Sequence, residues 1–130
     1  GAANLALNNV TAQTQGLDSH GLFVDNGFSD VSVVGLTVST AGQNADGIQL
    51  TGGDTFSLTS STFTTIEDTD VLDFTGVTTI SGTGNLASLF GDLGGVLFQD
   101  GGGNAPAGGL TFSFVDADGD GVNDGAVNIP

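Results

Sequence analysis

The feature that most constrains this chain is a repeat of about 25 residues. Four similar segments, HGLFVDNG, DGIQLTGG, DVLDFTGV and GVLFQDGG, begin at His20, Asp46, Asp70 and Gly95. A second set in the same phase, NLALNN, DVSVVG, TFSLTS and TTISGT, begins at Asn4, Asp30, Thr55 and Thr78. Two registers that agree on one spacing indicate a repeat architecture, in which each repeat is one structural unit.

The composition of each repeat favours strands. The chain has 23 Gly and many Thr, Ser and Asn residues, which are poor helix formers. Its apolar residues alternate with small polar ones, as in strands, and no repeat carries a helical pattern that could serve as a βαβ crossover. We therefore predict an all-β chain that folds as a parallel β-solenoid of about four coils with a period near 25 residues, its strands stacked about 4.8 Å apart. The competing interpretation is a β-sandwich whose segments are similar by accident.

Alternation of apolar and polar residues predicts which side chains face the interior. The first inward set is Leu5, Leu7, Val31, Val33, Phe56, Leu58 and Ile80. The second is either Leu22, Ile48, Leu72 and Leu97 or their alternating neighbours Phe23, Leu50, Phe74 and Phe98. The alternation alone does not decide between these two sets.

The rung length and pattern over residues 4–101 resemble the right-handed parallel β-helix of pectate-lyase-like proteins. We divide the chain into solenoid repeats at 1–101, a Gly-rich linker at 102–109, and a C-terminal strand and loop at 110–130. The strand LTFSFV, residues 110–115, is amphipathic, with Leu110, Phe112 and Phe114 on one face.

The acidic loop DADGDGVND, residues 116–124, predicts a calcium site. Carboxylates this close repel one another unless a cation offsets their charge. Ca²⁺ takes six to eight oxygens at flexible angles, and Gly121 supplies the turn that lets them converge. The predicted ligands are the carboxylates of Asp116, Asp118 and Asp120, the Val122 carbonyl, and Asp124 directly or through water.

The pattern D-x-D-x-D-G-x-x-D resembles the calcium loops of thrombospondin type 3 repeats, dockerins and EF-hands. It departs from the EF-hand, because Val127 stands at the twelfth position in place of Glu and no flanking helices are evident. The resemblance therefore implies a solitary loop of the type 3 kind. The competing interpretation is a solvated acidic turn that binds nothing strongly.

The charge of the chain limits its partners. There is no Lys or Arg, against 15 Asp and Glu, for a formal net charge of −15. Nucleic acids and anionic membranes are excluded as partners, since nothing neutralises phosphate, whereas multivalent cations are favoured. Cysteine is absent, and no stretch reaches the length of a membrane-spanning helix. The lack of trypsin-type cleavage sites suits a persistent extracellular or cell-surface polymer.

A catalytic interpretation is the alternative. The stretch NADGI, residues 44–48, resembles the N-T-D-G stretch of polygalacturonases, and SHG, residues 19–21, is similar to their G-H-G. If the repeats stack in the register given above, Asp46 and Asp70 lie on neighbouring coils near His20. Two stacked carboxylates can act as acid and base. The family's substrate-binding Arg and Lys are missing, and coil corners favour the same residue types. We therefore predict that the protein is not an enzyme, and that His20 is a surface corner residue.

The ends of a solenoid suggest the function. Each end exposes unpaired backbone and an apolar cross-section. We predict a structural subunit or module of an extracellular fibre, surface layer or adhesin, which self-assembles head to tail into a homopolymer and is ordered by Ca²⁺. The strand 110–115 contacts either a neighbouring subunit or its own terminal coil, and the residues assigned to self-association are Leu5, Leu7, Leu110, Phe112 and Phe114. The alternative is a carbohydrate-binding or polygalacturonase-like β-helix that acts on polysaccharide.

Overall fold

The computed structural model describes residues 4–25, 27–65, 70–89, 98–104, 109–114 and 125–128. Within these ranges the secondary structure is entirely β, and no helix there is long and apolar enough to cross a membrane. The strands are β1 (Asn4–Asn8), β2 (Thr11–Thr14), β3 (Leu22–Val24), β4 (Phe28–Val34), β5 (Thr37–Thr40), β6 (Ile48–Thr59), β7 (Thr62–Thr65), β8 (Leu72–Leu89), β9 (Phe98–Asp100), β10 (Gly109–Phe114) and β11 (Gly125–Asn128).

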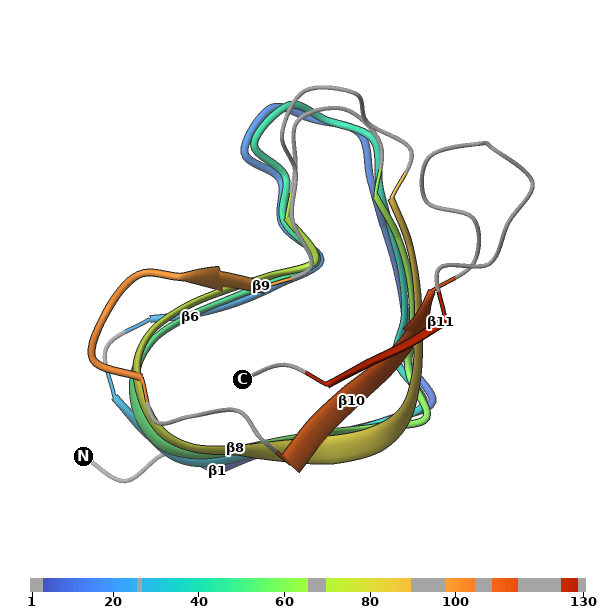
Figure 1. Cartoon of the computed structure of the whole chain (residues 1–130). Coiled ribbons are helices and arrows are strands. Elements are labelled where there is room, and N and C mark those ends of the chain that lie inside the picture. The colour runs from blue at the N-terminus through green and yellow to red at the C-terminus, as the bar shows by residue number, and fades with distance from the viewer. Residues whose placement is uncertain are drawn as a thin grey trace.

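The strands stack in parallel from coil to coil. One row runs β1-β4-β6-β8, a second runs β2-β5-β7-β8, and a third runs β3-β6-β8-β9. Viewed down the stack, successive coils follow the same L-shaped path, with a re-entrant corner between an arm and a base (Figure 1). The prediction of a parallel β-solenoid of about four coils with a period near 25 residues is confirmed, and the sandwich is excluded.

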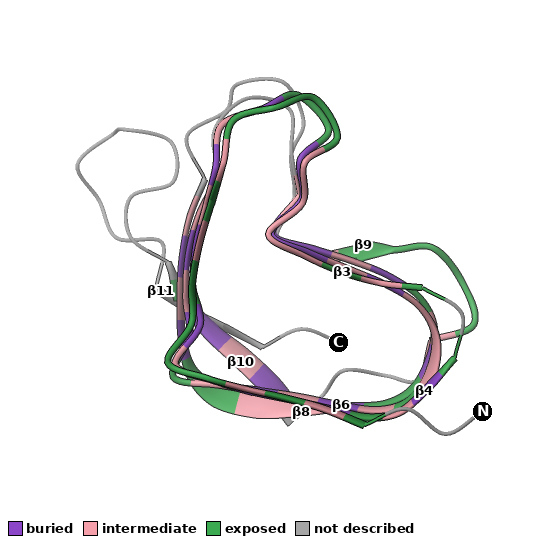
Figure 2. Cartoon of the chain, turned by 180° about the vertical axis from the view of Figure 1, so that it is seen from behind, coloured by how far each residue is buried: buried purple, intermediate pink, exposed green. Residues whose placement is uncertain are grey.

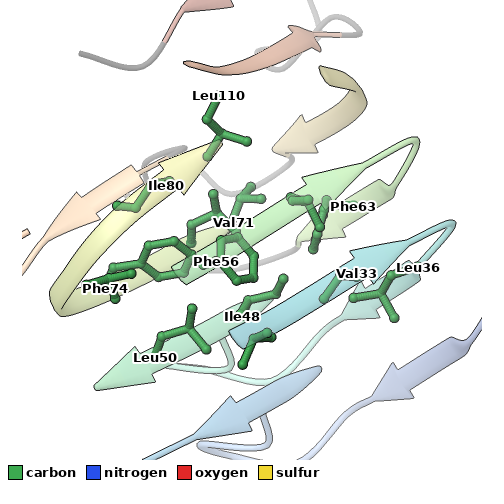
Figure 3. Close-up of a cluster of buried hydrophobic side chains, with 14 of the residues drawn as sticks. Val33, Leu36, Ile48, Leu50, Phe56, Phe63, Val71, Phe74, Ile80 and Leu110 are labelled. Carbon is green, nitrogen blue, oxygen red and sulfur yellow. The ribbon is translucent and has the colours of Figure 1, made fainter. Parts of the chain in front are cut away.

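The first predicted interior column is correct residue by residue. Leu5 pairs with Val31, Val31 with Phe56, and Phe56 with Ile80. Val31 and Phe56, in the middle coils, are fully buried, whereas Leu5 is only partly buried against the core because no coil precedes it in the described chain. Figure 3 shows the core side chains converging from successive coils.

The structure corrects the prediction for the second inward-facing set of residues. Ile48, Leu50, Leu72 and Phe74 are all fully buried, so alternate residues of one strand face inward together. Phe23 is 53% exposed and pairs with Gln49, because it follows the inward-facing Leu22 by one residue and so faces outward. In the last coil Phe98, rather than Leu97, is the partner of Leu72. Leu97 lies outside the described residues.

The coil corners are positions of left-handed backbone. At one corner four successive coils of the described chain place a residue with positive φ, namely Asn9 (56°), Gly35 (68°), Ser60 (52°) and Gly84 (76°). The main-chain N–H of Asn9 donates to the Val34 carbonyl, and that of Ser60 donates to the Thr83 carbonyl. Gly and Asn tolerate this conformation best, which explains why turn residues recur with the period of the strands.

The C-terminal strands lie on the last coil of the same chain. β10 pairs in parallel with β8, and Leu110 and Phe112 are buried in the core. Figure 2 shows these buried positions as purple bands on β10, while β9 is largely exposed. β11 pairs with β10 in the antiparallel direction. Part of the segment predicted as a linker also follows the solenoid, since the main-chain N–H of Gly76 donates to the Gly102 carbonyl.

Candidate functional site

The chain turns at the re-entrant corner of the L just before β3 and β6 (Figure 1). The residues that precede and begin these strands, with their counterparts on β8 and β9, line a cleft of about 420 Å³. The side chains around it come from successive coils, because the same corner recurs in each repeat. All of them are polar, and they are Asp18, His20, Asn44, Asp46, Gln49, Asp70, Asp73 and Gln99.

A ladder of hydrogen bonds between successive coils runs along one wall of this cleft. The Nδ1 atom of His20 accepts a hydrogen bond from the main-chain N–H of Asp46 at 3.0 Å. One coil further on, the Oδ1 atom of Asp46 accepts from the main-chain N–H of Asp70, also at 3.0 Å. The side chain on each coil thus caps the backbone of the next coil at this corner.

The same hydrogen bonds determine which nitrogen of the His20 imidazole carries the proton. An Nδ1 atom that accepts an N–H carries no proton, so this network assigns the tautomer protonated at Nε2. The 3.6 Å approach of His20 Nδ1 to Asp46 Oδ2 is consequently not a hydrogen bond, since both atoms present lone pairs. His20 is a structural acceptor in this arrangement.

Asp46 is the most perturbed carboxyl group of the cleft. The residue is only 6% exposed, and its pKa is raised to about 6, first of all by burial and then by the neighbouring carboxylates of Asp70 and Asp73. The Asp70 N–H bond acts in the opposite direction, because it favours the ionised form. The outcome is a buried carboxyl whose pKa lies well above the usual range of an Asp side chain.

The other wall of the cleft is an outward-facing column on the stacked strands β3, β6, β8 and β9. Its members, in coil order, are Phe23, Gln49, Asp73 and Gln99. The Nε2 atom of Gln49 donates to Asp73 Oδ2 at 3.2 Å. The Phe23 ring stacks on His20 with 5.7 Å between the ring centroids, so an exposed aromatic face adjoins the polar cleft at the first coil.

The sequence predicted part of this site. Asp46 and Asp70 do stack on neighbouring coils beside His20, as the phase of the repeat implied. The outward column of Gln49, Asp73 and Gln99 was missed. Its signal is the polar residue that directly follows the short apolar run (I, VL and VLF) of each corner segment in three successive repeats. In the described ranges no group of three or more His, Cys, Asp or Glu side chains has a geometry suited to a metal ion.

The predicted calcium ligands Asp116, Asp118, Asp120, Val122 and Asp124 lie outside the described residues. The strands on either side of them are described. Phe114 at the end of β10 is the antiparallel partner of Gly125 at the start of β11. The two described residues that flank this segment are therefore paired with each other.

The residues assigned to self-association fall into two groups. Leu5 and Leu7 are partly buried on the first coil. Leu110 and Phe112 are buried, and the backbone of Phe114 pairs with Ala87 of β8. Of the two contacts predicted for strand 110–115, the structure contains the one with the chain's own terminal coil, and contact with a neighbouring subunit stays a prediction.

Comparisons of the chain with protein-family models, with curated proteins and with solved structures find no significant match.

Proposed function

We propose that this protein is a structural β-solenoid module of an extracellular fibre, surface layer or adhesin, which stacks head to tail on copies of itself and is ordered by calcium. The observation that carries the proposal is the open edge of the first coil. Among the described strands, β1, β2 and β3 each have a partner on one side only. Their other edges present unpaired N–H and C=O groups, which are a template for another strand.

The interior of the first coil supports the same proposal. Its inward residues pack on the core and yet remain only partly buried; they are Leu5, Leu7, Ala12, Leu22 and Val24. The equivalent residues of the middle coils are fully buried. A coil stacked on this end would remove the remaining apolar surface from water, which is favourable by roughly 25 cal/mol per Å².

The opposite end offers a matching surface. The column Leu22, Ile48, Leu72 and Phe98 ends at β9, whose outer edge is free among the described strands. Leu22 of a following copy would extend that column beyond Phe98. At the neighbouring position β11 covers the outer edge of β10, so the next copy would meet β11 there. Head-to-tail contacts of this kind do not close and so produce filaments.

The proposed role of calcium is to lower the electrostatic repulsion between copies of the chain. Copies that each carry a formal charge of −15 repel one another. Cations held by Asp116, Asp118, Asp120, Val122 and Asp124 would lower that repulsion at the end of the chain that must approach a neighbour. A weak loop of this kind is filled at the millimolar calcium of extracellular fluids.

A proline at the open edge tests the stacking directly. The N–H of Leu22 donates to the Gly47 carbonyl. Because parallel strands alternate the direction of their backbone groups, the N–H of Phe23 points to the free edge. Phe23→Pro therefore removes an edge donor and adds a ring there, while it leaves the bonds within the coil intact. The matched control is Phe23→Ala, which loses the same ring and keeps the donor.

Sedimentation velocity with calcium and salt should show assembly of the wild type and of Phe23→Ala, and a monomeric Phe23→Pro. Urea unfolding would confirm that both variants fold. Equal assembly of a folded Phe23→Pro and of the control would contradict docking at this edge.

The cleft favours a second candidate, a carbohydrate-binding β-helix of the pectate-lyase-like kind. The exposed face of Phe23 beside the amide of Gln49, with Gln99 further along the same column, suits a neutral oligosaccharide, whereas the carboxylates disfavour acidic glycans. Calorimetric titration with neutral oligosaccharides tests this candidate, with Gln49→Ala as the variant that should weaken binding. Release of reducing ends that disappears in Asp46→Asn and Asp70→Asn would establish a hydrolase instead.

A further inference from the structure

One row of the solenoid ends in a strand of the opposite direction. In this row β2, β5, β7, β8 and β10 stack in parallel, and β11 then pairs with β10 in the antiparallel direction (Figure 1). Every other strand pair among the described residues is parallel. The strand β11 therefore does not continue the stack as a further coil would.

The register of the row shows which strand a further coil would place at this edge. Thr11 of β2 pairs with Thr37, and Thr37 pairs with Thr62. Thr62 pairs with Leu86, which pairs with Ser113 of β10. A second copy stacked on this end in the same register would therefore place its own Thr11, and with it its β2, beside Ser113.

That position is already taken in the single chain. Ser113 pairs with Ala126 of β11, and Phe112 pairs with Val127. A strand has two hydrogen-bonding edges, and over these residues β8 occupies one edge of β10 and β11 the other. The β2 strand of a second copy and the chain's own β11 thus compete for one edge.

We propose that β11 is a displaceable cap, which covers the outer edge of β10 in the single subunit and gives way to β2 of the next copy during assembly. This inference rests on the proposed head-to-tail stacking and adds the step that controls it. The outer edge of β9 is free among the described strands, so β3 of the next copy can pair there first, before β11 leaves.

The exchange of strands favours the stacked form because it buries apolar surface. β2 and β11 are each four residues long, so one set of main-chain hydrogen bonds replaces another of similar size. Val10, the residue before β2, is 37% exposed, whereas its counterpart Leu36 on the second coil is buried. In the stack Val10 would lie beside Phe112 of the preceding copy and lose that exposure to water, which is favourable.

A disulfide between β10 and β11 tests the cap. Ser113 and Ala126 are directly opposite partners, and the chain has no cysteine of its own, so Ser113→Cys with Ala126→Cys can form one defined bridge. The oxidised protein cannot release β11, and the same protein after reduction is the matched control. Sedimentation velocity at fixed calcium and salt should show an oxidised protein that stays monomeric and a reduced protein that assembles like the wild type.

The converse variant weakens β11 without a crosslink. In an antiparallel pair, one of any two neighbouring residues bonds to the partner strand, so Ala126→Pro with Val127→Pro removes at least one N–H donor to β10. Assembly should become about fivefold faster, the factor that corresponds to the loss of one main-chain hydrogen bond. The control, Ala126→Ser with Val127→Thr, keeps both donors and should assemble at the rate of the wild type.

The outcomes separate the cap from the stacking itself. Equal assembly of the oxidised and reduced protein would overturn the cap and leave the stacking intact. Slower assembly of the proline variant would also overturn it, because the next copy would then add to the outer edge of β11. If the wild type, the reduced protein and the proline variant all stay monomeric, both the stacking and the cap are wrong. Urea unfolding checks that the proline variant is folded, and if it is not, the disulfide pair decides alone.

Discussion

The imidazole of His20 accepts a hydrogen bond at Nδ1 from the main-chain N–H of Asp46, 3.0 Å away on the next coil. Asp46 makes the same contact to the coil that follows, so an imidazole and a carboxylate occupy equivalent rungs of one ladder. Each of these side chains places an acceptor atom close enough to bond the backbone of the next coil, which lies about 4.8 Å away along the stack. The only histidine of the chain is thereby part of what joins the first coil to the second.

Removal of the His20 imidazole should weaken the contact between the first and second coils. In His20→Ala the N–H of Asp46, a buried residue, loses its acceptor, and we expect the free energy of unfolding to fall by about 1 kcal/mol. Hydrogen exchange at the Asp46 amide should become faster, and His20→Asn should restore much of its protection. Unchanged exchange at this amide in His20→Ala would contradict the ladder.

A second ladder lies at another corner and centres on Asn85, which is only 2% exposed. Its Oδ1 atom accepts from the Ser61 N–H at 3.1 Å, and its Nδ2 atom donates to the carbonyls of Leu58 and Thr111 at 3.0 and 3.2 Å. One side chain thus satisfies backbone groups on the preceding coil and on β10. This contact ties the C-terminal strand to the solenoid.

Asn85→Leu should therefore be among the most destabilising single changes. It leaves buried backbone groups without partners, each at a cost of about 1–3 kcal/mol, and we expect a loss of about 3 kcal/mol or more in urea unfolding. Gln13→Leu, at an exposed position of β2, is the matched control and should change stability little. Comparable effects of the two substitutions would show that the Asn85 network contributes no special stability.

Chelation tests the C-terminal loop. If Asp116, Asp118, Asp120 and Asp124 bind calcium in the folded state, a chelator should lower the thermal midpoint and excess calcium should restore it. Asp118→Ala should abolish most of this response, whereas Asp54→Ala, at an exposed position of β6, should retain it. A melting curve that does not change on chelation would rule out a stabilising site.

The fold was predictable because its signal is repeated. Each column, such as Leu5, Val31, Phe56 and Ile80, samples the same interior position several times, so an irregular residue in one coil does not hide the pattern. A period of two along each strand then decides which neighbours face the core. The part of the site that recurs with the coils, Asp46 and Asp70 beside His20, followed from the same phase.

The rest depends on features that the repeat does not encode. The sequence predicted Leu97, 25 residues after Leu72, but the partner of Leu72 is Phe98, 26 residues after it. The apolar run VLF is compatible with either register. Asn85 looks in the sequence like any surface turn residue. Its burial follows from the position of β10, which no local pattern indicates. Asp46 and Asp73 line the same cleft because of the re-entrant bend of the coil, a property of the three-dimensional path.

Electron microscopy of the purified wild-type protein tests the central proposal most directly. At high concentration, with millimolar calcium and physiological salt, we predict unbranched filaments with an axial repeat of about 4.8 Å between strands. In a chelator at low salt the filaments should give way to short species, because the Debye length grows from about 8 Å to about 30 Å at 0.01 M and the charges repel over longer distances. Single particles of monomer size under the assembling conditions would contradict head-to-tail stacking.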